Sequence, residues 1–262
     1  MLLLALLSGC GTCDARNSSP GNPIQDAIDA AEPGDEVVVC GGTYKGTLSI
    51  DKELTLTAES EDARVFVDGE LSGPILTITD AAVTVQDIGF QHAGTDADGR
   101  GGAIWIEQDN SLSLPYVVLE NVLIEDGRDS GVVLTGGTLI GRHLTVQDSR
   151  AEVGAALRVL AGEVSLDEPT FEGNDADLGG ALYVDDGGEV TMTSGRICEN
   201  RATNGGGAWL VAASTEEPPG TLTAISSDWC EGDEDNFPDD VATTDNSYLF
   251  GDNVDFTLSG PS

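Results

Sequence analysis

Short apolar stretches follow one another along the first half of the chain, each only a few residues long. Within them apolar and polar positions alternate, which places successive side chains on opposite faces of a strand. The stretches are Glu36–Tyr44, Gly46–Ile50, Glu53–Ala58, Arg64–Gly69, Ile75–Thr79 and Val83–Phe90. Between them the sequence has no amphipathic segment of helical length. The pattern therefore predicts many short strands joined by turns.

The strands recur at a regular spacing. A small residue after a glycine or a pair of glycines marks one strand type, at Ala103, Val132, Ala156, Ala181 and Ala208. A large apolar residue marks a second type, at Phe90, Ile124, Val146, Phe171, Ile197 and Trp229. Two strand types that alternate with a period of about 25 residues predict a solenoid, in which each coil buries its apolar face on its neighbours.

One amphipathic helix is expected before the coils. Asn22 is a suitable N-cap and Pro23 suits the first helical position. Apolar residues at Ile24, Ala27, Ile28 and Ala31 form one face, and the turn at 33–35 ends the helix. We therefore assign residues 23–35 to a capping helix and turn, 36–231 to coils and 232–262 to an acidic C-terminal cap. Phe237, Tyr248, Phe250 and Phe256 are its candidate apolar plug.

The repeated residues carry a family resemblance. The segment 24–58 resembles the N-terminal cap and first coil of pectin-lyase-like right-handed parallel β-helices. Phe171-x-x-Asn174 followed by Gly179-Gly180-Ala181-Leu182 resembles the FxxN and GGA[ILV] repeats of polymorphic outer-membrane proteins, and Ile197-x-x-Asn200 with Gly206-Gly207-Ala208 is a looser copy. The resemblance implies an all-β, right-handed single-stranded parallel β-helix, whose open bottom is closed by the short N-terminal helix.

The repeated glycines and asparagines are expected to build this wall. Glycine allows a positive φ in a tight turn between stacked coils. Asn174 and Asn200 are able to hydrogen-bond to the turn backbone and to each other along a ladder.

Alternation assigns the faces of the strand after each glycine pair. Ile104, Ile106, Leu157, Val159, Leu182 and Val184 are expected to point inward, and Trp105, Leu134, Arg158, Tyr183 and Leu210 outward. Aromatic side chains beside an arginine form a platform for a sugar or a partner protein. Trp105, Arg158 and Tyr183 are therefore our candidate ligand-binding residues. The alternatives are a covering loop or ordinary cross-strand packing.

The turns before these strands are charged. Asp96 and Asp98 lie in a segment, 95–99, that begins like a calcium loop, so they are candidate Ca²⁺ ligands. The alternative is a solvated ladder of ion pairs, which stabilises little. Lyases of the resembled fold use an arginine or lysine base, and the arginines in these turns are Arg100, Arg128 and Arg150.

The first ten residues point to export. Leu7-Ser8-Gly9-Cys10 follows an apolar run and resembles the lipobox of bacterial lipoproteins. The resemblance implies a signal peptide at 1–9, lipidation of Cys10, and a tether at 10–22. The mature protein is then expected on the bacterial outer membrane or cell surface, attached to the membrane through lipid.

Four further cysteines remain. Cys198 and Cys230 occupy matching places on neighbouring coils, and Cys13 with Cys40 would staple the tail to the first coil. We expect these two disulfides in an exported chain, with free thiols as the alternative. The spacing does not suggest zinc.

The charge excludes one class of partner. The chain has 47 acidic residues against 11 basic ones, a net charge of −36. Such a chain repels phosphates, so no nucleic-acid partner is expected. No cofactor is indicated, apart from the option of Ca²⁺.

Together these features favour a non-enzymatic surface protein: a scaffold, an adhesin or a glycan-binding module, with a polysaccharide or a surface protein as partner. The alternative is a carbohydrate-active enzyme, either a Ca²⁺-dependent polysaccharide lyase or a glycoside hydrolase. The Asn-Thr-Asp and Gly-His-Gly motifs of polygalacturonases do not occur. The sequence therefore favours binding over catalysis.

Overall fold

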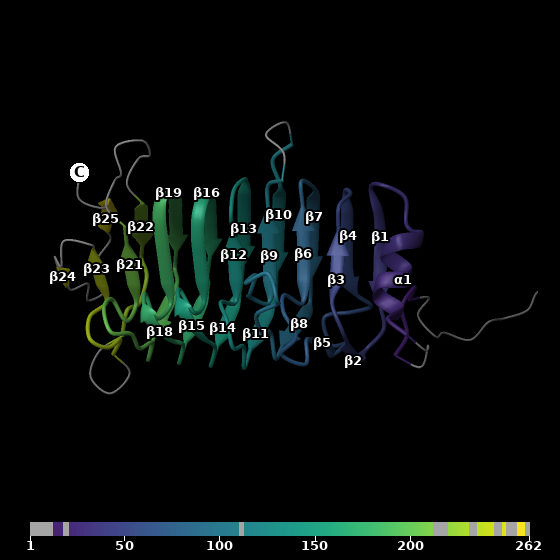
Figure 1. The fold of residues 1–262 in the computed structure, drawn as a ribbon, viewed down its shortest axis with the longest axis horizontal. Coiled ribbons are helices and arrows are strands. Elements are labelled where there is room, and N and C mark those ends of the chain that lie inside the picture. The colour runs from purple at the N-terminus through teal and green to yellow at the C-terminus, as the bar shows by residue number, and fades with distance from the viewer. Residues whose placement is uncertain are drawn as a thin grey trace, which may run out of the picture.

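A computed structural model of the chain describes residues 13–17, 21–109, 113–211, 220–230, 235–243, 248–249 and 256–259. The described chain is a parallel β-solenoid with one short helix, α1 (Pro23–Ala30), and it confirms the predicted fold class. The coils stack along the long axis of the molecule, with α1 and β1 at one end and β23, β24 and β25 at the other (Figure 1).

Three series of strands build the coils. The first series is β1 (Asp35–Val39), β4 (Leu54–Ala58), β7 (Ala82–Gln86), β10 (Tyr116–Glu120), β13 (Thr138–Arg142) and β22 (Thr221–Ile225). The second is β2 (Gly42–Lys45), β5 (Val65–Asp68), β8 (Ile88–Gln91), β11 (Leu123–Glu125), β14 (Thr145–Gln147), β17 (Thr170–Glu172) and β20 (Arg196–Cys198). The third is β3 (Leu48–Ile50), β6 (Leu76–Thr79), β9 (Ile104–Glu107), β12 (Val132–Leu134), β21 (Ala208–Leu210) and β23 (Val241–Thr243).

Two long strands join the first and third series. β16 (Leu157–Asp167) pairs with β12 through its first residues and with β13 through its last, and β19 (Leu182–Thr193) continues both series. The remaining strands are β15 (Arg150–Val153), β18 (Asp175–Leu178), β24 (Tyr248–Leu249) and β25 (Phe256–Ser259).

The core lies inside the coils, because the strands of the three series with described side chains turn apolar residues inward. In the second series the inward row is Phe90, Ile124, Val146, Phe171 and Ile197, which are paired in register on successive coils and have no exposed surface. This row is the second sequence marker. Stacking equivalent residues about 4.8 Å apart removes a continuous apolar column from water.

The repeated phrase around residues 174 and 200 forms a buried ladder of asparagines. Asn174 Nδ2 donates to Asn200 Oδ1 and Asn200 Nδ2 donates to Asn236 Oδ1, both at 3.0 Å. Each side chain also bonds the backbone of the preceding coil, for example Asn200 Nδ2 to the Phe171 carbonyl at 2.9 Å. Gly179 takes a φ of +61°, and a Cβ there would overlap the backbone of Leu182. The expected turn roles of Asn and Gly are therefore present, and Asn236 adds a third rung.

The helix caps the first coil. Asn22 accepts the Gln25 amide, while Ile24 and Ile28 lie fully inside the core cluster. Gln25 Oε1 accepts from the Ser49 amide at 2.8 Å, and its Nε2 donates to the Ser49 carbonyl at 3.2 Å. Asn22 Nδ2 also donates to the Thr47 carbonyl. Helical side chains thus take the hydrogen bonds that a further strand beside β3 would make, and such covering protects a sheet edge from aggregation.

Both predicted disulfides are present. Cys13 pairs with Cys40 near the first coil and Cys198 with Cys230 near the last, with Cα–Cα distances of 5.4 and 5.5 Å. The sequence placed Cys13 in a tether, but residues 13–17 lie against β1 instead, with a parallel bridge between Ala15 and Val39. At the far end, β25 and β24 pair antiparallel with β22 and β23.

Candidate functional site

The row that contains our candidate ligand-binding residues is set by strand register. Trp105 pairs with Val133, Val133 with Arg158, Arg158 with Tyr183, and Tyr183 with Trp209. Trp105, Arg158 and Tyr183 therefore do share one outward row, as predicted.

Two members of the predicted stripe were wrong. Leu134 and Leu210 point into the core and have no exposed surface, and Val133 and Trp209 occupy the outward positions instead. The cause is the phase of the small-residue marker. Val132 and Ala208 align with Ile104 and Leu182 rather than with the alanines before them. A slip of one residue moves a side chain to the other face of the sheet.

The outward row is only partly accessible. Trp105, Arg158 and Tyr183 are half-buried, whereas Val133 is 0% exposed and Trp209 is 7% exposed. The Nε atom of Arg158 is shielded from solvent and has no hydrogen-bond partner among the described residues. The row is therefore not one broad platform. Trp105 adjoins an open space through its neighbours: it pairs in register with Thr77 and its indole bonds Glu107, and both of these residues line that space.

That space is a groove on the outer face of β3, β6 and β9, which we call the Trp105 groove. Its volume is about 590 Å³. Residues from α1, the three strands and the connecting loops line it: Gln25, Thr47, Leu48, Ser49, Ser72, Gly73, Pro74, Thr77, Thr79, Asp96, Arg100 and Glu107. Nine of these twelve residues carry a hydroxyl, amide or charged side chain. The groove thus offers many hydrogen-bonding groups beside one indole ring.

Glu107 is the centre of the polar network in the groove. Its Oε2 accepts a hydrogen bond from Trp105 Nε1 at 2.9 Å, and its Oε1 accepts from Thr79 Oγ1 at 3.0 Å. Arg100 Nη1 lies 3.8 Å from the same Oε1. These contacts fix the indole and the carboxylate relative to each other, so the groove is organised before any ligand binds.

Asp96 organises the loop on one side of the groove. Its Oδ1 accepts from the backbone amides of Arg100 and Asp98, both at 2.9 Å, and its Oδ2 lies 3.2 Å from Arg100 Nε. The hydrogen bond from the Arg100 backbone amide is the main cause that lowers the pKa of Asp96. The hydrogen bond from the Asp98 amide and the Arg100 guanidinium lower it further.

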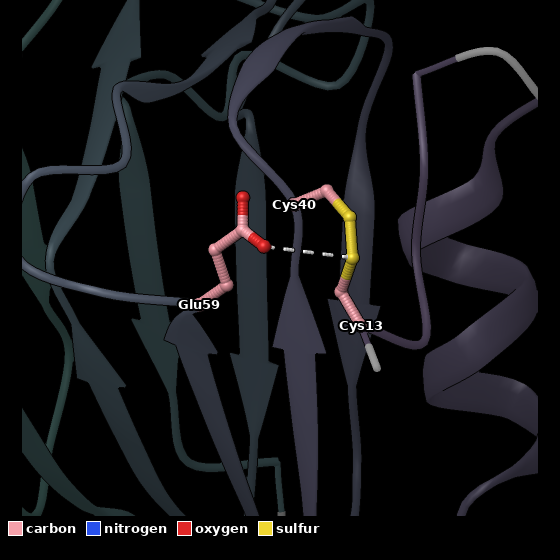
Figure 2. A group of neighbouring side chains, drawn as sticks. All are labelled: Cys13, Cys40 and Glu59. Atoms are coloured by element: carbon pink, nitrogen blue, oxygen red, sulfur yellow. Dashed lines mark hydrogen bonds between the residues drawn. A yellow bond between two sulfur atoms is a disulfide. The ribbon is translucent and has the colours of Figure 1, made fainter. Parts of the chain in front are cut away.

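The geometry of Asp96 and Asp98 gives little support to the calcium hypothesis. Both oxygens of Asp96 are engaged within the loop, and Asp98 is exposed. Among the described residues, the clusters with metal-ligand spacing are Cys13, Cys40 and Glu59, and Cys198, Asp228 and Cys230. In each of these clusters the two cysteines form a disulfide, and Figure 2 shows the Cys13–Cys40 disulfide beside Glu59. A disulfide offers no thiolate to a metal.

The arginines proposed from the sequence as a lyase base are divided between two places. Arg100 lies in the Trp105 groove, where Asp96 and Glu107 hold it. Arg128 and Arg150 are exposed and line a second groove of about 500 Å³, together with His92, Asp126 and Asp148. Sequence reasoning therefore brought together residues that the fold keeps in separate grooves.

Several groove residues were not predicted. Gln25, Thr79 and Glu107 are far apart in the chain and have no shared motif. The available signal was register: Thr79 pairs with Glu107 on adjacent strands, one step after Trp105 on the same face.

Comparison with known proteins adds no assignment. No protein-family model matches this sequence, and no curated protein is significantly similar to it. The fold and the groove are thus the observations on which a function is proposed.

Proposed function

We propose that this protein is an exported, lipid-anchored and non-enzymatic β-helix that binds a saccharide in the Trp105 groove. The observation that carries the proposal is the groove itself: a polar hollow of about 590 Å³ whose lining residue Glu107 accepts a hydrogen bond from the half-buried Trp105. The resemblance of the sequence to pectin-lyase-like β-helices is part of this proposal. It does not fix the activity, because one fold hosts many activities.

A sugar fits the chemistry of the groove. One face of a pyranose ring is apolar and packs on an indole, while its hydroxyls need several donors and acceptors. The groove supplies hydroxyls from Ser49, Thr77 and Thr79. Small-molecule sites combine concave shape with such a set of convergent polar groups.

The carboxylates favour binding over hydrolysis. A glycosidase needs one carboxylic acid with a raised pKa to protonate the leaving oxygen. In the groove the pKa of Asp96 is lowered instead, mainly because Asp96 accepts a hydrogen bond from the Arg100 backbone amide. Glu107 accepts two hydrogen bonds, and its Oε1 lies 3.8 Å from Arg100 Nη1. Both carboxylates thus serve as hydrogen-bond acceptors in the groove.

Two observations support export and anchoring. Disulfides persist in oxidising compartments, and the two in this chain join its first and last coils to neighbouring segments. Cys10 of the lipobox-like sequence supplies the lipid attachment; it lies outside the described residues. α1, the single helix in the described part of the chain, is too short to cross a membrane.

The first test is binding to a panel of neutral and acidic oligosaccharides, measured by calorimetry. We expect Trp105→Ala to weaken the binding of the best ligand about two- to tenfold, since a contact with an aromatic ring contributes about 0.5–1.5 kcal/mol. Tyr116→Ala is the matched control, because Tyr116 is an aromatic residue on another outer face and is 48% exposed.

Two results would contradict the proposal. One is a ligand whose affinity is unchanged by Trp105→Ala. The other is the release of Ca²⁺-dependent unsaturated fragments from a polyuronate, detected by mass spectrometry, which would make the protein a lyase.

A further inference from the structure

We propose that the α1 end of the solenoid, made of residues 13–17, α1 and β1, faces the lipid bilayer at close range. The partner surface is the bilayer that carries the acyl chains of Cys10, so this inference rests on the proposed lipid anchor. Only two residues, Gly11 and Thr12, separate Cys10 from Cys13. Cys13 in turn is fixed to the first coil.

Several bonds fix this segment. Beside the Cys13–Cys40 disulfide, the Asp14 amide donates to the Val38 carbonyl at 2.7 Å, and Asp14 Oδ2 accepts from the Val38 amide at 2.8 Å. The Ala15 carbonyl accepts from the Cys40 amide at 3.0 Å and from the Tyr44 hydroxyl at 3.1 Å. Ala15 is fully buried. Residues 13–15 therefore behave as an edge of the first coil and not as part of a linker.

The length of the chain between Cys10 and Cys13 then limits the distance from the membrane to the first coil. Three steps of extended chain span at most about 11 Å between Cys10 and Cys13. If all of residues 10–22 were free, as the sequence suggested, the same argument would allow about 40 Å. The fixed segment therefore removes most of the freedom that a lipoprotein tether would give, and the first coil has to stay next to the lipid headgroups.

Charge opposes this approach but does not prevent it. The α1 end is acidic: Asp14, Asp26, Asp35 and Glu36 surround a hollow at its surface. Repulsion from anionic headgroups falls off over a Debye length of about 8 Å at physiological salt, which is comparable with the tether. The acyl chains hold the chain in the membrane regardless, so the repulsion acts on tilt and not on attachment.

This orientation also places the Trp105 groove. Gln25 of α1 and Ser49 of β3 line the groove, so it lies at the membrane-proximal end. Stacked strands rise about 4.8 Å per coil, so the seven strands from β2 to β20 span about 29 Å. Saccharides bound in the groove would therefore lie close to the membrane surface, and the C-terminal end would be outermost.

The test uses acylated full-length protein in phosphatidylcholine vesicles. A photo-crosslinking amino acid, p-benzoylphenylalanine, replaces exposed Asp26 in α1 or, in a second variant, exposed Asp235 near the far end. After irradiation, protein–lipid adducts are measured by mass spectrometry. We expect at least fivefold more lipid adduct at position 26 than at position 235.

A linker variant supplies the matched control. Inserting 20 Gly and Ser residues between Thr12 and Cys13 allows a root-mean-square separation of about 25 Å, so the adduct at position 26 should fall severalfold while acylation persists. An acylated protein with equal adducts at both positions, or with no effect of the insertion, overturns the orientation alone. A protein without acyl chains on Cys10 overturns the proposed anchor, and the orientation with it.

Discussion

Asn200 shows how a single residue holds two coils together. Its side chain is fully buried, donates to the Phe171 carbonyl and to Asn236 Oδ1, and accepts from Asn174 Nδ2. A buried side-chain amide with all its hydrogen bonds made stabilises the fold only modestly in net terms. Its removal, however, leaves its buried partners without hydrogen bonds. The ladder therefore matters most for what its loss would leave unpaired.

We predict that Asn200→Ala lowers the free energy of unfolding by about 2–4 kcal/mol, because the amides of Asn174 and Asn236 each lose a buried partner. Urea denaturation followed by circular dichroism measures this change. The control is Asn121→Gly: Asn121 is exposed, bonds Asp87, and has a φ of +51° that glycine adopts easily. It should change stability by less than about 1 kcal/mol. Equal losses for both variants would refute a special role for the ladder.

At the scale of elements, the two ends of the solenoid are held separately. The disulfide at the first coil closes a separation of 27 residues, and the one at the last coil a separation of 32 residues. Loops of this size contribute roughly 3–4 kcal/mol through the unfolded state. In a solenoid each coil contacts only its neighbours, so the loss of one disulfide should act locally.

We therefore predict that the double variant Cys13→Ser, Cys40→Ser raises hydrogen exchange mainly in residues 13–17 and in β1. The variant Cys198→Ser, Cys230→Ser should instead raise it in β20 and β22. Exchange followed by mass spectrometry compares the two variants directly. Uniform loosening of the whole chain in either variant would contradict this local coupling.

The elements also show how far the sequence predicts the structure. Alternation within strands and the spacing of Phe90, Ile124, Val146, Phe171 and Ile197 are direct consequences of stacked coils, so fold class and core follow from them. The outward row was wrong at two positions because Val132 and Ala208 align with Ile104 and Leu182 and not with the alanines before those residues.

The Trp105 groove was harder to predict for a physical reason. It is built where Gln25 and the loops near Ser72 and Asp96 meet the strands, and these loops do not follow the repeat. Periodicity predicts what the coils have in common. A site made by the parts that differ between coils leaves no periodic signal.

For the molecule as a whole, charge is the dominant property. A net charge of −36 on 262 residues means that folding brings many carboxylates closer together than in the unfolded chain. The described ion pairs are few and mostly exposed, for example Lys45 with Glu70 and Arg142 with Glu120, so they relieve little of this repulsion.

We predict that the melting temperature rises by several degrees when NaCl increases from about 10 mM to about 150 mM, because the Debye length shortens from about 30 Å to about 8 Å and screens the repulsion. Differential scanning calorimetry measures the shift. CaCl₂ at the same ionic strength separates screening from a specific site. Screening alone gives a similar rise, whereas a clearly larger rise that Asp96→Asn abolishes would favour a calcium ion at the groove loop. A melting temperature that does not change with NaCl concentration would mean that repulsion among the acidic residues does not measurably lower the stability of the fold.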